Sequence, residues 1–231
     1  MSTKNDVFMG FLSLTLWSAL TLVLMRIIET VFVSYYDTGF WSHVLNNMLG
    51  ACFDVVYLAV ASLVLFVPYY FFSKMSIRRT SLVFRWLYAV VSLVAMLMIS
   101  YFSQTGVPLD RVFFAYSLKE IIEIIDTSQT TAWWMYICIA IVPLFLLFVS
   151  RKTLKLNKIR CIIMGIIVWV CVVVRCVFYD SSMNNEGYYE QCNKICYFMK
   201  SVVSGGDVDD YSDEDLPVGA IREFQIGRAH V

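Results

Sequence analysis

The sequence has few charged residues. Lys, Arg, Asp and Glu make up 16% of its 231 residues, whereas about 25% is usual in soluble domains. Hydrophobic residues account for 59%, and the mean hydropathy is +0.69. A chain this poor in charge cannot cover its surface with solvated groups, so the composition excludes an ordinary soluble domain and favours a membrane protein.

Residues that bind metals or carry out catalysis are also scarce. The only histidines are His43 and His230, and structural zinc normally takes four protein ligands. Cys192 and Cys196 lack further ligands nearby, and we interpret them as unpaired thiols on an interfacial helix. The sequence has no Gly-rich phosphate loop and no Cys/His nucleophile pair. We therefore predict no catalytic residue, metal site or cofactor in this chain, and no nucleic-acid partner.

Long apolar runs dominate the rest of the chain. A helix needs about 20 mostly apolar residues to cross the hydrocarbon layer. The five runs that meet this need are approximately 7–33, 49–72, 82–102, 132–149 and 161–178. The first run is too long for the apolar part of a signal peptide. We predict an all-α fold: a five-helix transmembrane bundle with an outer interfacial helical segment and a flexible acidic tail.

The loops between the runs predict one orientation. Lys and Arg stay on the cytoplasmic side of short loops. They gather after the second and fourth runs, at Lys74, Arg78, Arg79, Arg151, Lys152, Lys155, Lys158 and Arg160. The loop "SYYDTGFWSHVLNN" after the first run contains none. We predict an N-terminus inside and a C-terminus outside.

Four charges lie inside the apolar runs, near their outer ends: Arg26, Glu29, Asp54 and Arg175. Ionisable residues within a membrane are costly and usually face the bundle interior in pairs. Arg26 and Glu29 are three positions apart and share a helix face. The four are either an ion-pair cluster that fixes helix register or a site that holds an anionic lipid head group.

The outer segment "TGVPLDRVFFAYSLKEIIEIID" is apolar but too charged to cross the membrane. Pro108 and Asp110 are typical of a helix start, and Ser117 with Glu120 forms a capping box. We predict two short interfacial helices over about residues 108–126. They either cover the bundle or form a platform for an outer domain or a lipid-access groove. The candidate platform residues are Pro108, Asp110, Arg111, Phe113, Phe114, Tyr116, Ser117 and Glu120.

Beyond the last run, residues 180–225 form a predicted outer connector. Its stretch "SGGDVDDYSDEDLP" is acidic without basic residues, which is typical of a flexible linker. The final "IGRAHV", residues 226–231, matches the translation of ATCGGAAGAGCACACGTC, part of a common sequencing adapter. We expect that the native sequence ends near Gln225 and that the rest is read-through of an incomplete gene.

Five helices, an outward C-terminus and the segment "TGVPLDRVFFAYSLKEI" resemble the lipoteichoic acid synthase-like membrane sulfatases of the alkaline phosphatase superfamily. The stretches "NKICYFMKSVV" and "REFQ" are similar to the connector that leads to that family's outer catalytic domain. The resemblance implies a bacterial cytoplasmic membrane protein that acts on membrane lipids, including an anionic lipid substrate. It also implies a divalent metal and a Thr or Ser nucleophile in a domain downstream of this chain, so no catalytic residue is assigned here.

Two functions follow as hypotheses. The first is the membrane-anchoring N-terminal portion of a lipid-linked phosphoglycerol transferase or sulfatase/phosphohydrolase. The alternative is a self-contained, non-enzymatic membrane protein such as a small transporter subunit or assembly factor. Transporters tend to show repeats and helices broken at mid-membrane, and Pro143 is the main candidate breaker deep in a run.

Overall fold

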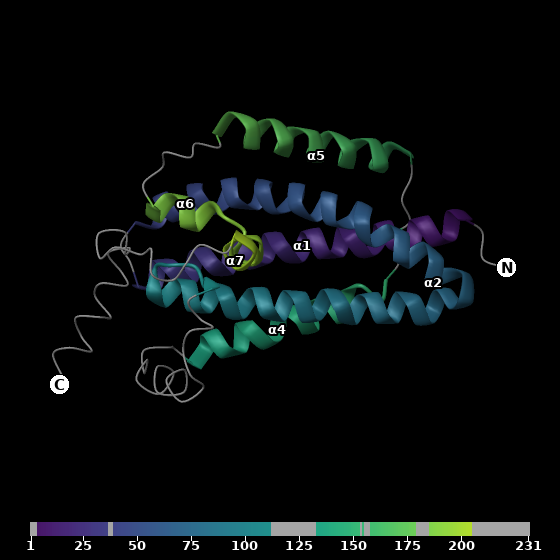
Figure 1. Ribbon diagram of the computed structural model, residues 1–231, viewed down its shortest axis with the longest axis horizontal. Coiled ribbons are helices and arrows are strands. Elements are labelled where there is room, and N and C mark those ends of the chain that lie inside the picture. Colours follow the sequence, from purple (N-terminus) through teal and green to yellow (C-terminus); the bar gives the residue numbers. More distant parts are fainter. Residues whose placement is uncertain are drawn as a thin grey trace.

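The computed structural model describes residues 4–36, 39–111, 133–152, 154, 158–178 and 185–204. Every regular element in these ranges is helical (Figure 1). The helices are α1 (Lys4–Tyr36), α2 (Phe40–Thr105), α4 (Trp133–Val149), α5 (Lys158–Phe178), α6 (Asn185–Gln191) and α7 (Lys194–Ser204). The all-α prediction is confirmed for the described residues.

Three of these helices are long and apolar enough to cross a membrane: Asn5–Tyr35, Phe40–Thr105 and Arg160–Val177. Helix α4 is also apolar but shorter, with 17 residues. Large apolar side chains are exposed along all four helices, as expected where lipid rather than water covers them. The chain is therefore a membrane protein by length and composition of its helices.

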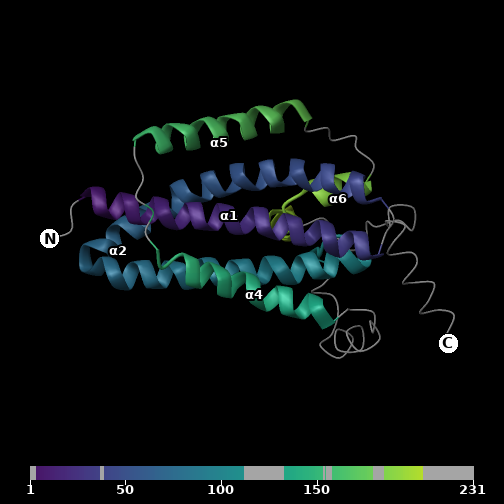
Figure 2. The same cartoon turned by 180° about the vertical axis from the view of Figure 1, so that it is seen from behind.

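Helix α2 contains both the second and the third predicted run and bends between them. A straight helix of its length would extend about 99 Å, roughly three times the hydrocarbon thickness. At Ser76 the backbone leaves the helical region, with φ −162° and ψ 107°. The chain reverses at this end of the molecule, and the two arms of α2 run back along α1 (Figures 1 and 2). The break in the apolar pattern around residues 73–81 is thus a change of direction.

Aromatic side chains hold the reversed arms against α1. The ring centroids of Phe11 in α1 and Tyr69 in the first arm are 5.0 Å apart, and Tyr69 lies 5.1 Å from Phe84 in the second arm. Farther along, Met25 and Phe32 of α1 join a second buried cluster that includes Met96 of α2 and other residues of α2 and α4. The core is thus built between α1, both arms of α2 and α4.

The predicted outer elements are described only in part. Helix α2 ends at Thr105 and is capped by Gly106, which adopts a left-handed φ of 71° and donates its N–H to the carbonyl oxygen of Phe102. Residues 107–110 are not helical, so a helix does not begin at Pro108. The rest of the predicted interfacial segment lies outside the described residues, as do the acidic stretch and residues 226–231. The predicted connector contains two helices, α6 and α7, which the acidic composition farther on did not indicate.

Candidate functional site

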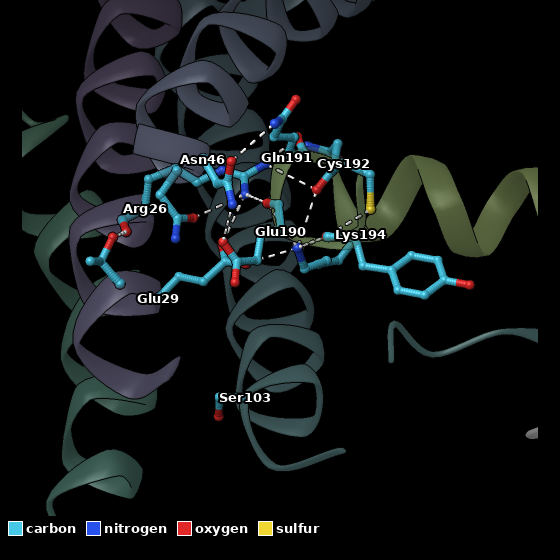
Figure 3. A network of polar contacts seen from close by, with 12 residues as sticks. Arg26, Glu29, Asn46, Ser103, Glu190, Gln191, Cys192 and Lys194 are labelled. Carbon is cyan, nitrogen blue, oxygen red and sulfur yellow. Dashed lines mark hydrogen bonds and ion pairs between the residues drawn. The ribbon is translucent and has the colours of Figure 1, made fainter. Parts of the chain in front are cut away.

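A buried network of polar side chains joins α1 and α2 to α6, to α7 and to the turn between them (Figure 3). At its centre is Arg26, whose side chain is only 5% exposed. Its Nε donates to Asp54 Oδ2 at 2.6 Å, and Nη1 donates to Glu29 Oε2 at 3.0 Å. The network brings together three of the four charges that the sequence places inside the apolar runs.

Arg26 also reaches the backbone of the turn between α6 and α7. Nη1 donates to the carbonyl oxygen of Glu190 at 2.7 Å, and Nη2 donates to the carbonyl oxygens of Cys192 at 3.0 Å and Gln191 at 3.4 Å. Nη1 also lies 3.4 Å from Asn47 Oδ1. A guanidinium has five N–H donors, and these acceptors occupy both terminal nitrogens as well as Nε. None is left for a lipid phosphate, which favours the ion-pair interpretation of Arg26.

Lys194, at the start of α7, supplies the second buried cation. Its Nζ lies 2.8 Å from Glu29 Oε1 and 4.0 Å from the ring centroid of Phe102. Nζ also donates to the carbonyl oxygens of Tyr189 at 2.5 Å and Glu190 at 3.2 Å. Glu29, fully buried at 0% exposure, thus pairs with Arg26 through one oxygen and with Lys194 through the other.

A third carboxylate, Glu190 of α6, is held by the first turns of α2. Its Oε1 lies 2.6 Å from His43 Nδ1, and its Oε2 accepts a hydrogen bond from Asn46 Nδ2 at 2.8 Å. Asn46 in turn accepts from Gln191 Nε2 at 3.1 Å. Helix α6 is therefore fixed to α2 through side chains at both of its last positions.

Asn193 links the cap of α7 to the same network. Its Oδ1 accepts the backbone N–H of Cys196 at 3.0 Å, as an N-cap residue does. Its Nδ2 donates to Asp54 Oδ1 at 2.6 Å. One amide side chain thus starts the helix and satisfies the second oxygen of a buried carboxylate.

Gly50 allows the close approach that the network needs. A Cβ at this position would lie 2.8 Å from Arg26 Cζ and 3.0 Å from the carbonyl oxygen of Gln191. A larger residue would push the guanidinium away from the α6–α7 turn.

Arg175, the fourth charge that the sequence singled out, contacts aromatic side chains of α2. Its Nη2 donates to the hydroxyl of Tyr57 at 3.0 Å, and its guanidinium lies over the rings of Tyr57 and Phe53, 4.5 and 5.6 Å from their centroids. It therefore attaches α5 to the first arm of α2 through a cation–π contact.

The candidate platform residues are described only at the start of the segment. Pro108 is fully buried, and Asp110 and Arg111 are half-buried. The backbone N–H of Arg111 donates to Ser201 Oγ at 2.8 Å, which ties this segment to α7. The other candidates, Phe113, Phe114, Tyr116, Ser117 and Glu120, lie outside the described residues.

Sequence reasoning missed the other side chains of the network: His43, Asn46, Asn47, Glu190, Gln191, Asn193 and Lys194. They lie outside the apolar runs or at their edges, where polar residues are ordinary. The two positive and two negative intramembrane charges already balanced, so nothing in the count indicated that further partners were needed. Only the polar-rich stretch "NNEGYYEQCNK", which follows shortly after the last run, could have drawn attention to α6.

The thiols beside the network are free, as are all seven cysteines. Burial raises the pKa of the Cys192 thiol, and burial likewise raises the pKa of the Cys196 thiol.

Among the described residues, no three His, Cys, Asp or Glu side chains are grouped so that they could hold a metal ion. The network joins two buried cations and three carboxylates through ion pairs and hydrogen bonds, and this dense pairing suits a structural clamp.

Comparisons with known protein-family models, with curated proteins and with solved structures found no match.

Proposed function

We propose that these residues are the membrane-anchoring portion of a lipid-linked phosphoglycerol transferase or sulfatase/phosphohydrolase of the lipoteichoic acid synthase-like type. In this proposal, five crossings of a bacterial cytoplasmic membrane place the N-terminus inside and α6–α7 outside. A metal-dependent catalytic domain follows farther along the polypeptide. The anchor holds that domain at the height of the lipid head groups.

The clamp on α6–α7 is the observation that carries the proposal. Helices α6 and α7 are fixed to the bundle, because Arg26 binds three carbonyl oxygens of the turn between them and Lys194 lies beside Glu29. Ser201 of α7 also accepts the N–H of Arg111 from the segment after α2. A chain that leaves Ser204 therefore starts from a fixed position on the bundle. Such fixation suits an enzyme that must meet a lipid head group at a set distance from the membrane.

The orientation is tested with two fusions, each made directly after Ser204. One carries alkaline phosphatase, and the other carries a fluorescent protein that folds only in the cytoplasm. We expect the phosphatase to be active and the fluorescent fusion to be dark. The reverse pattern would contradict the outward placement of α6–α7.

The activity is tested with the gene extended by its own downstream codons. The purified protein is reconstituted in liposomes that contain phosphatidylglycerol, with and without a divalent metal, and diacylglycerol release is measured beside hydrolysis of an aryl sulfate. Turnover of either substrate supports the proposal. A folded protein that turns over neither, or a gene without a downstream catalytic domain, would instead favour a self-contained membrane protein.

The role of the clamp is tested in the same assay with Lys194→Met, which removes the cation beside Glu29. Lys200→Met, an exposed position on the same helix, is the matched control. We expect transfer from membrane-embedded lipid to fall for Lys194→Met more than hydrolysis of a water-soluble ester. Equal loss of both reactions would indicate a general folding defect.

A further inference from the structure

A second polar feature lies at the other end of the bundle, where α1 begins and α2 reverses (Figure 2). A cavity of about 1060 Å³ opens there between α1, the bend of α2 and the residues after α4. Binding pockets for small molecules usually measure about 300–1,000 Å³, so it has room for a head group. It lies about 24 Å along α1 from Arg26, at 1.5 Å per residue, and is thus separate from the clamp.

The cavity is strongly positive. Four arginines line it: Arg78, Arg79, Arg85 and Arg151. The only carboxylate among its described lining residues is Asp6. Arg85 and Arg151 are close enough for their like charges to act on each other. An anion placed between them would relieve this repulsion.

Arg85 differs from an ordinary loop arginine. It projects from the second arm of α2, and its Nε is buried without a hydrogen-bond partner among the described residues. The preference for basic residues on the cytoplasmic side explains why arginines gather at such an end. It does not explain a buried guanidinium nitrogen in the wall of a cavity, because an arginine can set the orientation of a membrane protein while its side chain is fully exposed. A buried donor left without an acceptor is costly, and a bound oxyanion would remove that cost.

Uncharged residues of α1 and α2 complete the lining of the cavity. Gly10 of α1 lines the cavity, and a Cβ there would lie 3.3 Å from the hydroxyl oxygen of Tyr69. Met9, Ile77 and Leu82 line the cavity as well. This mixture of apolar lining residues and cationic donors matches a phosphate group attached to an apolar body.

We propose that this cavity binds a phosphate-bearing anion, with Arg85 and Arg151 as its main ligands and a phospholipid head group as its source. Guanidinium groups bind phosphate through paired charge-assisted hydrogen bonds, and basic pockets between transmembrane helices bind anionic lipid head groups. The assignment does not depend on the proposed function, because it concerns residues at the opposite end of the bundle.

Binding is measured on the purified chain in detergent by isothermal titration. The lipid probe is dihexanoyl phosphatidylglycerol, the soluble probe is glycerol 1-phosphate, and dihexanoyl phosphatidylcholine is the zwitterionic control. We expect phosphatidylglycerol to bind the wild type more tightly than phosphatidylcholine. Arg85→Gln should weaken that binding at least about tenfold, the usual value of a lost hydrogen bond to a charged group.

Arg151→Gln is the second variant, for the case that Arg85→Gln fails to fold. The side chain of Arg151 is exposed, so this change should not disturb the core. Lys74→Gln removes an exposed charge outside the cavity and should bind like the wild type. Glycerol 1-phosphate that binds as tightly as the lipid, with the same loss in the arginine variants, would support the site with a soluble phosphate as ligand. The proposal is overturned if the wild type binds neither phosphate probe, or if Arg151→Gln binds both as the wild type does.

Discussion

At the scale of single residues, Arg26 is a charged side chain buried inside the bundle, and its burial must be compensated by its partners. Burying an ion costs several kcal/mol even after the surroundings relax. Here two carboxylates and three backbone carbonyls surround the guanidinium, so its charge and its donors are both compensated. The arrangement depends on close packing, because Asp54 and the three carbonyls are far from Arg26 along the chain.

Gly50→Ala tests that packing. The new Cβ would meet Arg26 Cζ at 2.8 Å and the carbonyl oxygen of Gln191 at 3.0 Å. We expect a loss of about 1–3 kcal/mol in unfolding free energy, as is typical of overpacking. Thermal unfolding in detergent measures the loss.

Gly165→Ala is the matched control, because a Cβ there meets nothing within 4 Å. Alanine is favoured over glycine in a helix by about 0.5–1 kcal/mol, so this variant should be neutral or slightly more stable. If both variants had the same stability, the close approach at Gly50 would carry no energetic weight.

The Cys192 thiol gives a prediction for pH dependence. Burial raises its pKa, so the folded state favours the protonated thiol. This contribution to stability is full below the unfolded-state pKa, about 8.5, and is lost as the pH rises through the higher folded-state value. We expect Cys192→Ala to reduce the loss of stability that the wild type shows as the pH rises above about 8.5.

Alkylation provides the independent measurement for the same thiol. Thiolate is the reactive form, so iodoacetamide at pH 8 should modify Cys192 more slowly than a cysteine introduced at the exposed Lys200 position. Peptide mapping by mass spectrometry separates the two. Equal rates in the folded protein would contradict a raised pKa for Cys192.

How far the site could be predicted from sequence differs between residues. The spacing of Arg26 and Glu29 predicted their contact, because residues three apart share a helix face. Depth in the apolar runs indicated Asp54 as a further partner. The pairing with Lys194 could not be predicted, since it depends on how α6 and α7 pack onto the bundle. The contact of Arg175 with Tyr57 could not be predicted either, because it depends on how α5 packs against α2.

At the scale of elements, the apolar runs located the helices well because hydrophobic length is a strong signal. The predicted run 7–33 lies within α1, and 161–178 lies within α5. Runs 49–72 and 82–102 both lie in α2, where the polar interval remains helical on both sides of Ser76.

Asn193 allows the cap of α7 to be separated from its tertiary contact. Asn193→Ser keeps a hydroxyl that can cap Cys196 but loses the donor to Asp54. Asn193→Ala loses both. We expect the alanine variant to be less stable than the serine variant by about 1 kcal/mol, the usual value of an N-cap, with both below the wild type.

Chemical unfolding of the two variants measures this difference. Equal stability of the serine and alanine variants would show that the cap contributes nothing. A serine variant as stable as the wild type would show that the bond to Asp54 is dispensable.

At the scale of the whole molecule, the last described helices complete the first ones. Residues 190–194 supply acceptors and a cation to partners on α1. A chain that ends after residue 184 would leave Arg26 without its carbonyl acceptors and Glu29 without Lys194. Breaking a buried pair costs about 3–5 kcal/mol, so we expect a strongly reduced yield of folded protein in the membrane.

A chain that ends after Ser204 is the control, because it retains α6 and α7. Size-exclusion chromatography of both chains in detergent measures the folded fraction. Similar yields of folded protein for the two chains would mean that the bundle is stable without α6 and α7.

The distance along the chain between Glu29 and Lys194 also has a consequence for biosynthesis. A ribosome makes the polypeptide from its N-terminus, so α1 enters the bilayer long before its partner lysine exists. During that interval Glu29 must be shielded by Arg26 alone, or by the insertion machinery and chaperones. The arrival of Lys194 therefore completes the charge compensation of Glu29 only after the rest of the bundle has been made.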